Sequence, residues 1–500
     1  MRQGPLAGRY IATASMVMLA LIPFLALSAA LEPLTPYISA DLHMSAQTMS
    51  LSSGLGNAAY ALGTVLAVQF AQHLPQRRML VIYAVVLVIG SVLAASAQDA
   101  AMYITGHILQ GLTTSMLLIA AVPPLAIGYP RDKLRTTAVI MNMCIFGAVA
   151  LGPFIGGVQA ESHAWRPLFW IVAAISASAL VLALLTFEDA PPANPDSPRD
   201  LPAIGLAAVG CVSAFLGASE LTSHAILDAA VLAPLLGGLA LIVILVVYQY
   251  RAAQPLLTIR AMLTSSIPVA NIVVALFAAA AAVSATALTA SVLSEKYSGV
   301  HIGLLFLREL GGAIISAIAL GVVINKKAMH YLPLAGMTFL AAGIAVFLIK
   351  VPANAGLALV GSGLAGIGLG ATVAPALFVA GFSLPAANLQ RVFAIVELMR
   401  AVAAFLIAPI FFHFAATVRP GHINAGTSIA LWIGLGLALG GAALGVGIYA
   451  LSGARPQAPD LDRFLAGVSP AFYSPPLFGR GRSAPAEPVT AAPVLESVDS

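Results

Sequence analysis

Six ionisable side chains stand inside long apolar runs of this sequence and are its most informative residues. A charged side chain deep in a hydrocarbon layer costs at least about 2.5 kcal/mol on insertion scales, so it is expected to face a cavity or a partner. Groups of this kind bind and release protons, cations or the charged part of a ligand. The six are Glu32, Glu220, Arg308, Glu309, Glu397 and Arg400.

The spacing of these groups predicts which of them meet. Glu397 and Arg400 are three residues apart, which places them on one face of a helix and within reach of each other. Arg308 and Glu309 are neighbours and therefore point about 100° apart on a helix, toward different partners.

The two remaining acids lie nearer the ends of their apolar runs. For Glu220 the favoured interpretation is a residue at a helix end that reaches water. Glu32 is followed by Pro33 and Pro36, and the sequence supports a functional and a structural role for it equally.

The elements that hold these groups must be membrane helices. The 500 residues have a mean hydropathy of +0.97, with 60% hydrophobic and 8% charged side chains, whereas soluble domains carry about 25% charged residues. This composition excludes secreted disulfide scaffolds, nucleic-acid binders and disordered proteins, and it argues against a soluble enzyme. About fourteen apolar runs follow one another, each continuous rather than alternating, so helices and not barrel strands are expected to span the membrane.

The basic residues predict the orientation of these helices. With the N-terminus inside, 17 of the 23 Lys and Arg residues fall in inside segments, four fall in outside loops and two fall within spans. Such an excess follows the positive-inside rule. If one helix too few or too many had been counted, the excess would change sides in every loop after that helix. We therefore expect an even number of spans and two cytoplasmic termini.

Two polar interruptions divide the chain into six, two and six spans. Residues 188–200, EDAPPANPDSPRD, carry prolines and acids that cannot continue a helix. We expect an N-terminal six-helix bundle (1–187), a cytoplasmic linker (188–200), a central helix pair with its own linker (201–262) and a C-terminal six-helix bundle (263–451). Residues 452–500 are rich in Pro, Ala and Ser and are expected to form a disordered cytoplasmic tail.

No sequence pattern indicates an enzyme or a metal site. Cys144 and Cys211 lie in different spans, where a disulfide is not expected, and two isolated thiols make no metal site. The sequence has no metal-ligand cluster, phosphate loop or nucleophile motif. We therefore expect no catalytic residue, no metal and no cofactor.

The fifth span carries a dense set of small residues around a proline. Its segment GAVALGPFIGG permits close helix approach, and Pro153 frees a backbone carbonyl. The segment resembles the antiporter motif of the major facilitator superfamily, in the drug:proton antiporter family with fourteen spanners. Trp165, Arg166 and Phe169 resemble the start of that family's sixth span. The motif residues are Gly147, Gly152, Pro153, Gly156 and Gly157.

A second signature, the loop after the second span, is altered. The family pattern is G-x-x-x-D-R-x-G-R-R, whereas this chain reads VQFAQHLPQR, so that Gln72 replaces the acid and only Arg77 matches outright. In the family the acid forms charge contacts that latch the inward side. The resemblance therefore implies a latch that is weaker or differently built here, with Arg77 and Arg78 serving topology.

Two further signatures depart from the family at titratable positions. In the fourth span His107 stands where the family has Arg, ahead of Gln110 and Gly111. Histidine titrates near neutrality, so His107 is either a proton-handling group or a hydrogen-bonded structural residue. In the first span Leu27 takes the place of the family's Asp, and Glu32 lies about one and a half turns further outward.

The resemblance implies two bundles that expose a site near the membrane midplane to each side in turn. It implies a secondary active transporter that exports a small amphipathic compound in exchange for protons across the bacterial cytoplasmic (inner) membrane. A facilitative or uptake carrier and a non-transporting sensor or scaffold remain alternatives. The implied partners are a small-molecule substrate, protons and the lipid bilayer, without nucleic acid, and a monomer is expected.

The same resemblance places the tenth and thirteenth spans beside the cavity. On this basis Glu309 and Glu397 are the favoured proton-coupling sites, and Arg308 and Arg400 are their counter-charges. Further candidates are Glu32 and His107 for proton coupling, and the polar residues Gln110, Asn142 and Asn271 for contact with substrate.

Overall fold

The computed structural model describes residues 4–187, 192, 194–418 and 422–477 of the chain. Within these residues the fold is all-helical, and fourteen helical segments are long and apolar enough to cross a membrane. The expected all-α membrane architecture is confirmed. Several helices begin at a side chain that accepts a hydrogen bond from the N–H three residues further on, as at Ser45, Asp99, Asp200, Ser298 and Asn354.

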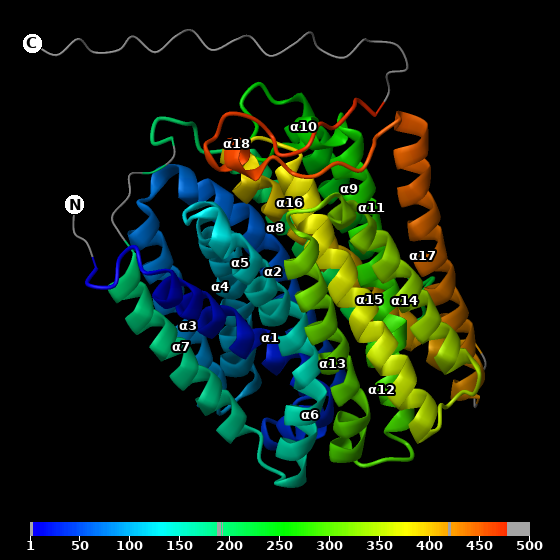
Figure 1. Ribbon diagram of the computed structural model, residues 1–500. Coiled ribbons are helices and arrows are strands. Elements are labelled where there is room, and N and C mark those ends of the chain that lie inside the picture. Colours follow the sequence, from blue (N-terminus) through cyan, green and yellow to red (C-terminus); the bar gives the residue numbers. More distant parts are fainter. Residues whose placement is uncertain (1–3, 188–191, 193, 419–421, 478–500) are drawn as a thin grey trace, which may run out of the picture.

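The first six spans pack around one another on one side of the molecule (Figure 1). The fifth span contains a short π-helical turn, η1, between two α-helices. The six consist of α1 (Tyr10–Asp41), α2 (Ala46–His73), α3 (Gln76–Ala95), α4 (Ala100–Ile127), α5 (Arg131–Asn142) with η1 (Met143–Gly147) and α6 (Ala148–Glu161), and α7 (Arg166–Thr186).

The next two spans form a pair that packs on α2, and the last six form a second group. The pair consists of α8 (Leu201–Ser219) with the turn η2 (Glu220–Thr222), and α9 (Ala229–Arg251). The second group consists of α11 (Ser266–Val283) with η3 (Ser284–Leu288) and α12 (Thr289–Leu293), α13 (Gly299–Val323), η4 (Lys327–Tyr331) with α14 (Leu332–Leu348), α15 (Ala355–Phe382), η5 (Ala386–Asn388) with α16 (Leu389–Thr417), and α17 (Ile423–Ser452).

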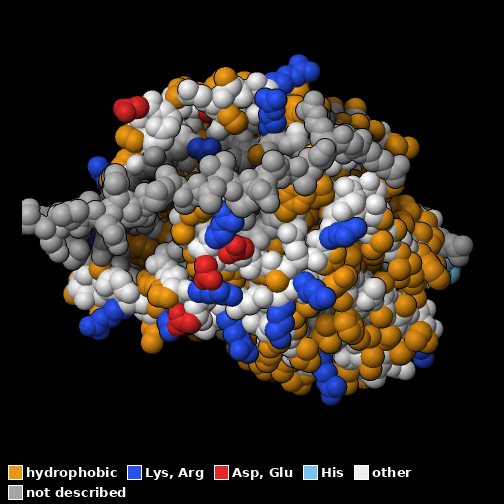
Figure 2. Space-filling model, turned by 45° about the horizontal axis from the view of Figure 1, so that its top comes forward, with side chains coloured by type: hydrophobic (Ala, Val, Ile, Leu, Met, Phe, Trp, Pro, Cys, Tyr) orange, Lys and Arg blue, Asp and Glu red, His pale blue; other side chains and the backbone are white. Residues whose placement is uncertain are grey.

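Residues 4–9 and 453–477 lie at the same end of the helices, which we call the terminal face (Figure 1). The opposite end is called the distal face. The short helices α10 (Ile259–Leu263) and α18 (Leu461–Leu465) lie at the terminal face. In Figure 2 Lys and Arg side chains gather on this face, while hydrophobic side chains cover the flank beside it. This division is typical of a protein that meets water at its ends and lipid on its flanks.

The two six-helix groups meet along two seams, one between α6 and α13 and the other between α2 and α16. At the first seam a side chain at Gly157 would place its Cβ only 2.3 Å from the carbonyl oxygen of Gly299. Glycines Gly152 and Gly156 of the same motif approach α1 equally closely, at Ala29 and Ala30. The small residues of the fifth span therefore allow α6 to pack against its own group and the other one together.

This close approach predicts that Gly157→Val destabilises the protein. The added side chain must push α13 away, and overpacking of this kind costs about 1–3 kcal/mol. Thermal unfolding of the purified protein measures the effect as a lower melting temperature. The matched control is Gly237→Val on α9, where a new Cβ would meet no atom within 4 Å. Equal melting temperatures for the two variants would contradict the tight seam.

The linker between the first group and the helix pair packs on the terminal end of α2. Of the expected linker 188–200, residues 188–191 and 193 lie outside the described residues. Ser197 donates a hydrogen bond to Gln72 Oε1 (2.8 Å), and the backbone N–H of Asp200 donates to Gln69 Oε1 (3.0 Å). The Asp200 carboxylate accepts a hydrogen bond from Gln249 of α9 (2.6 Å). Gln72, which replaces the acid of the family loop, thus finds an uncharged partner in the linker.

The prediction that the chain is disordered from residue 452 onward is wrong for residues 453–477, and residues 478–500 lie outside the described part. Phe464 and Phe472 are fully buried at the terminal face. The Phe472 ring packs 4.4 Å from the His330 ring, and the Phe464 ring packs 5.0 Å from the Phe382 ring. These aromatic contacts hold a segment whose proline-rich composition indicates disorder when it is considered alone.

Backbone hydrogen bonds fix the same segment to the second group of helices. The N–H of Ala471 donates to the Phe382 carbonyl (2.8 Å), and the N–H of Ser266 donates to the Pro475 carbonyl (3.0 Å). One ion pair, between Asp462 and Arg131 of α5 (2.6 Å), reaches the first group. Both partners of that pair are exposed, so it contributes at most about 1 kcal/mol.

Candidate functional site

A buried ionic cluster joins the two groups of helices at the seam between α2 and α16. The Tyr60 hydroxyl of α2 donates a hydrogen bond to Glu397 Oε1 (2.7 Å), and Arg400 Nε donates to Glu397 Oε2 (2.9 Å). A further Arg400 nitrogen bonds Glu397 Oε1. The contact between Glu397 and Arg400 is the one that their spacing in the sequence predicts.

This cluster is shielded from water. The exposed fraction is 1% for Tyr60, 4% for Glu397 and 9% for Arg400. A buried ion pair gains little net stability over an apolar pair, but removal of one partner leaves an uncompensated charge and costs about 3–5 kcal/mol. Both charges lie on α16, and the hydrogen bond from Tyr60 to Glu397 is the contact of this cluster that crosses the seam to α2.

A cavity of about 1050 Å³ lies on the distal side of this cluster, which we call the vestibule. Two helices supply facing stripes with helical periodicity, and the helix pair supplies the remaining wall. The stripes are Ala46, Met49, Ser50, Ser53, Gly54 and Asn57 on α2, and Phe405, Ala408, Pro409, Phe412, His413 and Ala416 on α16; the pair contributes Phe215, Ala218 and residues 219 and 221–227.

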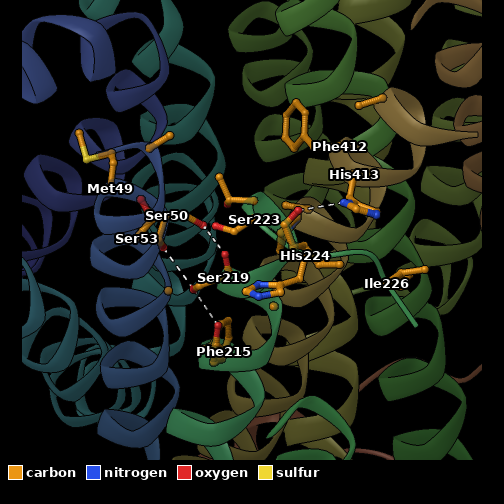
Figure 3. Close-up of a pocket in the computed structure, with 18 of the residues that line it drawn as sticks. Met49, Ser50, Ser53, Phe215, Ser219, Ser223, His224, Ile226, Phe412 and His413 are labelled. Carbon is orange, nitrogen blue, oxygen red and sulfur yellow. Dashed lines mark hydrogen bonds between the residues drawn. The ribbon is translucent and has the colours of Figure 1, made fainter. Parts of the chain in front are cut away.

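Some polar groups of the vestibule are used within the protein (Figure 3). The Ser219 hydroxyl donates to the Phe215 carbonyl (2.8 Å) and lies 3.3 Å from the Ser50 carbonyl. His413 Nδ1 donates to the Leu221 carbonyl (2.9 Å), which leaves Nε2 of the neutral ring as a hydrogen-bond acceptor. These bonds fix the helix pair to α2 on one side and to α16 on the other.

Other polar groups of the vestibule have no such partner. Ser53 and Asn57 lie one turn apart on α2, and their side chains make no hydrogen bond to any described residue. Since polar groups inside a membrane protein are normally hydrogen-bonded, these two are available to water or a ligand.

Phe405 connects the vestibule to the ionic cluster. It lines the cavity, its ring meets the Tyr60 ring edge-to-face at 5.9 Å, and the Arg400 guanidinium lies 6.0 Å from its centre. Tyr60 follows Asn57 by three residues and therefore continues the α2 stripe inward. The cluster therefore lies behind Phe405, next to the inner end of the vestibule.

Glu309 and Arg308 point to different sides of α13. Glu309 is 4% exposed and shares its face with buried Phe306 and Ala313. Arg308 is exposed and shares its face with Leu304 and exposed residues further along the helix, Ile315 and Ile318. Neither of the two forms an ion pair with a described residue. In this structure Arg308 has no acid beside it among the described residues, and its role as the counter-charge of a cavity acid stays a prediction.

The other candidate acids lie at different depths. Glu32 is exposed on α1, and Thr35, three residues further along, lines the vestibule. Glu220 lies at the rim, where Gln47 donates a hydrogen bond to its carboxylate (3.0 Å) and His224 lies 3.3 Å away. The expected placement of Glu220 at a helix end is what the structure shows.

The fourth-span candidates lie inside the first group of helices. His107 is buried between Phe24 and Tyr103, and its Nδ1 has no hydrogen-bond partner among the described residues. Gln110 donates to Ser91 on α3 (3.1 Å). Neither residue lines the vestibule.

The asparagine candidates lie at two separate places. Asn142 is fully buried at the α6–α13 side of the molecule and donates to the Gly370 carbonyl of α15 (3.0 Å), so it joins the two groups. Asn271 bonds the Tyr449 hydroxyl (3.2 Å) near the terminal face. Arg77 donates to the Leu184 carbonyl (3.0 Å) at that face. None of them lines the vestibule.

Sequence reasoning missed the α2 side of the site. Charged residues were the signal it used, and Tyr60, Ser53 and Asn57 carry no charge. Their spacing of three to four residues nevertheless places them on one face of the helix as a visible polar stripe, which indicates a face turned away from lipid. His413 could not be placed, because its partner lies in the helix pair.

Comparison with known proteins agrees with this architecture. The family model described as Major Facilitator Superfamily matches residues 16–409. A "Multidrug resistance protein B homolog" of Mycobacterium tuberculosis is 29% identical over 328 residues, 63% of this chain and 60% of that protein. The "Uncharacterized MFS-type transporter YubD" of Bacillus subtilis is 25% identical over 280 residues, 54% of each chain. The matches thus span about half to three fifths of these relatives.

Solved structures show the same fold at low sequence identity. A POT family transporter in complex with a thioalcohol conjugated peptide has a TM-score of 0.63 at 13% identity, covering 89% of this chain and 96% of that one. The proton:xylose symporter XylE has a TM-score of 0.60 at 11% identity, covering 87% and 94%. Since the family model covers most of the chain, this protein belongs to the Major Facilitator Superfamily, as a polytopic membrane protein with fourteen candidate spans among its described residues.

Proposed function

We propose that this protein exports a small amphipathic compound across the bacterial cytoplasmic membrane in exchange for protons. The observation that carries the proposal is the Tyr60–Glu397–Arg400 cluster, an acid–base group that closes the seam between two bundles at the inner end of an open cavity. The multidrug resistance relatives support an export function. The terminal face is the cytoplasmic one in this proposal, since Lys and Arg gather there.

The proposed cycle starts from the arrangement described above. Ionised Glu397 accepts hydrogen bonds from Tyr60 and Arg400, and the vestibule is open toward the distal face. A proton that arrives through the vestibule neutralises Glu397 and weakens both bonds, because the attraction between unlike charges is lost. The α2–α16 seam can then open toward the terminal face, where substrate enters. Loss of the proton to the cytoplasm restores the cluster and closes the seam.

Glu309 is a second proton site in this proposal. It is buried on α13 without a cation beside it among the described residues. Desolvating an isolated carboxylate is costly, so gain or loss of a proton at Glu309 changes the relative free energies of the open and closed states. The backbone of Glu309 packs against Gly366 of α15 within the second group, and α13 also forms the seam with α6, so protonation of Glu309 would act on that seam through α13.

The test is transport by the Glu309→Gln/Glu397→Gln variant in proteoliposomes. A panel of amphipathic dyes is screened first, and a dye that the unaltered chain moves serves as the probe. We expect at least a tenfold loss of uptake driven by a pH gradient, while counterflow of the dye without a gradient continues. The control is Glu295→Gln, an exposed acid at the distal face. Unchanged gradient-driven transport in the double variant would refute the proposed coupling.

A facilitative or uptake carrier is the second candidate. It is favoured by the uncharged contact between Gln72 and the linker, which stands where the family has a charged latch. Counterflow that is insensitive to a proton gradient in the unaltered protein would select this candidate.

A further inference from the structure

The vestibule differs from a simple opening because the inserted helix pair completes it. Phe215, Ala218 and the loop 221–227 close the side that would otherwise face lipid. The cavity is therefore a chamber whose main walls are α2, α16 and the pair (Figure 3), with Thr35 of α1 at its edge. Its volume of about 1050 Å³ is at the upper end of the range of drug-sized sites.

Histidines His224 and His413 are the titratable side chains among the described residues that line the chamber. No Asp, Glu, Lys or Arg occurs among the described residues that line it. The closest acid in the sequence, Glu220, is held at the rim by Gln47 and His224, and Arg400 lies behind Phe405, where it is paired with Glu397. An organic ion inside the chamber would be desolvated without a fixed counter-charge, which is unfavourable.

The polar groups of the chamber are arranged to bind a neutral ligand. His413 Nε2 and the carbonyl oxygen of Asn57 accept hydrogen bonds, and Ser53 both donates and accepts. They stand among apolar and aromatic side chains, of which Phe405 and Phe412 present rings on the α16 side. A few polar groups in an apolar wall are what orient a small molecule in a binding site.

We propose that the vestibule is a binding site for uncharged aromatic amphiphiles that carry a hydrogen-bond donor. The inference deepens the proposed export function, on which its role as a release site rests. Binding itself is independent of transport, so the two are tested separately. Phe405 itself packs on Tyr60. A ligand that contacts Phe405 can therefore influence the closure of the α2–α16 seam.

The test uses two dyes with the same aromatic skeleton. N-phenyl-1-naphthylamine is neutral and has one N–H donor, whereas 1-anilinonaphthalene-8-sulfonate adds a negative charge. Both become fluorescent in apolar surroundings. The purified full chain in lipid nanodiscs is titrated with each at about pH 8, above the ordinary range of histidine titration, and empty nanodiscs give the background. We expect saturable binding of the neutral dye and at least tenfold weaker binding of the sulfonate.

Variants locate the binding. Ala408→Trp fills the chamber and is expected to weaken binding of the neutral dye at least tenfold, whereas Ala443→Trp on the exposed face of α17 leaves it unchanged. Asn57→Leu, which removes one acceptor, is expected to weaken it about threefold to tenfold. Tetraphenylphosphonium, an organic cation, is expected not to displace the dye.

Equal affinity for the two dyes, displacement by the cation, or identical binding by the two Trp variants would each overturn the assignment. If Ala408→Trp does not fold, the dye comparison and the Asn57→Leu titration still decide the question. If the protein binds the neutral dye but shows no gradient-driven transport, the proposed binding site stands and the proposed export function is refuted.

Discussion

Replacing Arg400 by Leu will destabilise the folded protein by about 3–5 kcal/mol, because Glu397 is then left buried without its cation. Thermal unfolding of the purified protein will show a large decrease in melting temperature. In the Glu397→Gln/Arg400→Leu variant no unpaired charge remains, so most of the stability is expected to return. Transport driven by a pH gradient will stay low in both variants. In Arg400→Leu the carboxyl group of Glu397 no longer exchanges its proton during the cycle, and in the double variant this group is absent.

The matched control for this change is Arg308→Leu. Both arginines lie within membrane spans, but Arg308 is exposed on α13 and forms no ion pair with a described residue. Its replacement removes a charge from a lipid-facing stripe, so stability is expected to be unchanged or higher. Equal destabilisation by Arg308→Leu and Arg400→Leu would show that the environments of the two side chains do not differ as described.

Tyr60→Phe will shift the protein toward the conformation with an open terminal face. The variant loses one hydrogen bond to a charged group, worth about 1.5–3 kcal/mol, or about 10- to 150-fold in the ratio of the two conformations. Arg78 and Asn325 are exposed at the terminal face on different bundles. Spin labels at Arg78→Cys and Asn325→Cys measure the distance between the two bundles by pulsed electron paramagnetic resonance. In Tyr60→Phe we expect a population with a longer distance between the two labels than in the unaltered protein. The native Cys144 and Cys211 are buried and remain unlabelled.

Tyr83→Phe provides the same chemical change without the bond. Tyr83 is also buried in the first bundle, but its hydroxyl has no hydrogen-bond partner among the described residues. Its replacement is expected to leave the distance distribution unchanged. If Tyr60→Phe gave the same distribution as Tyr83→Phe, the bond from Tyr60 to Glu397 would not control the seam.

The helix number and the Glu397–Arg400 contact could be predicted because both depend on local rules. Apolar length decides whether a helix can span a membrane, and a spacing of three residues decides whether two side chains share a face. The direction of Arg308 could not be predicted. Adjacent residues on a helix differ by about 100°, but only the neighbouring helices decide which of the two faces lipid.

The vestibule and the ordered segment 453–477 depend on contacts between distant parts of the chain. Composition indicated disorder after residue 452, yet Phe464 and Phe472 bury their rings against residues more than 80 positions earlier. The vestibule likewise requires α8 to lie beside α2, a placement that no local pattern of either helix specifies. Uncharged groups such as Tyr60 acquire their role only through a partner more than 300 residues away.

The packing of α8 on α2 limits how a chain of this kind can be shortened. If α8 and α9 were deleted, by design or in evolution, the polar side chains of Ser50, Ser53 and Asn57 would lie at a boundary with fatty-acid chains instead of a protein wall. A working twelve-helix descendant would therefore need apolar substitutions on α2 together with the deletion. The two extra helices and the polar stripe on α2 have to be inherited, or lost, as one unit.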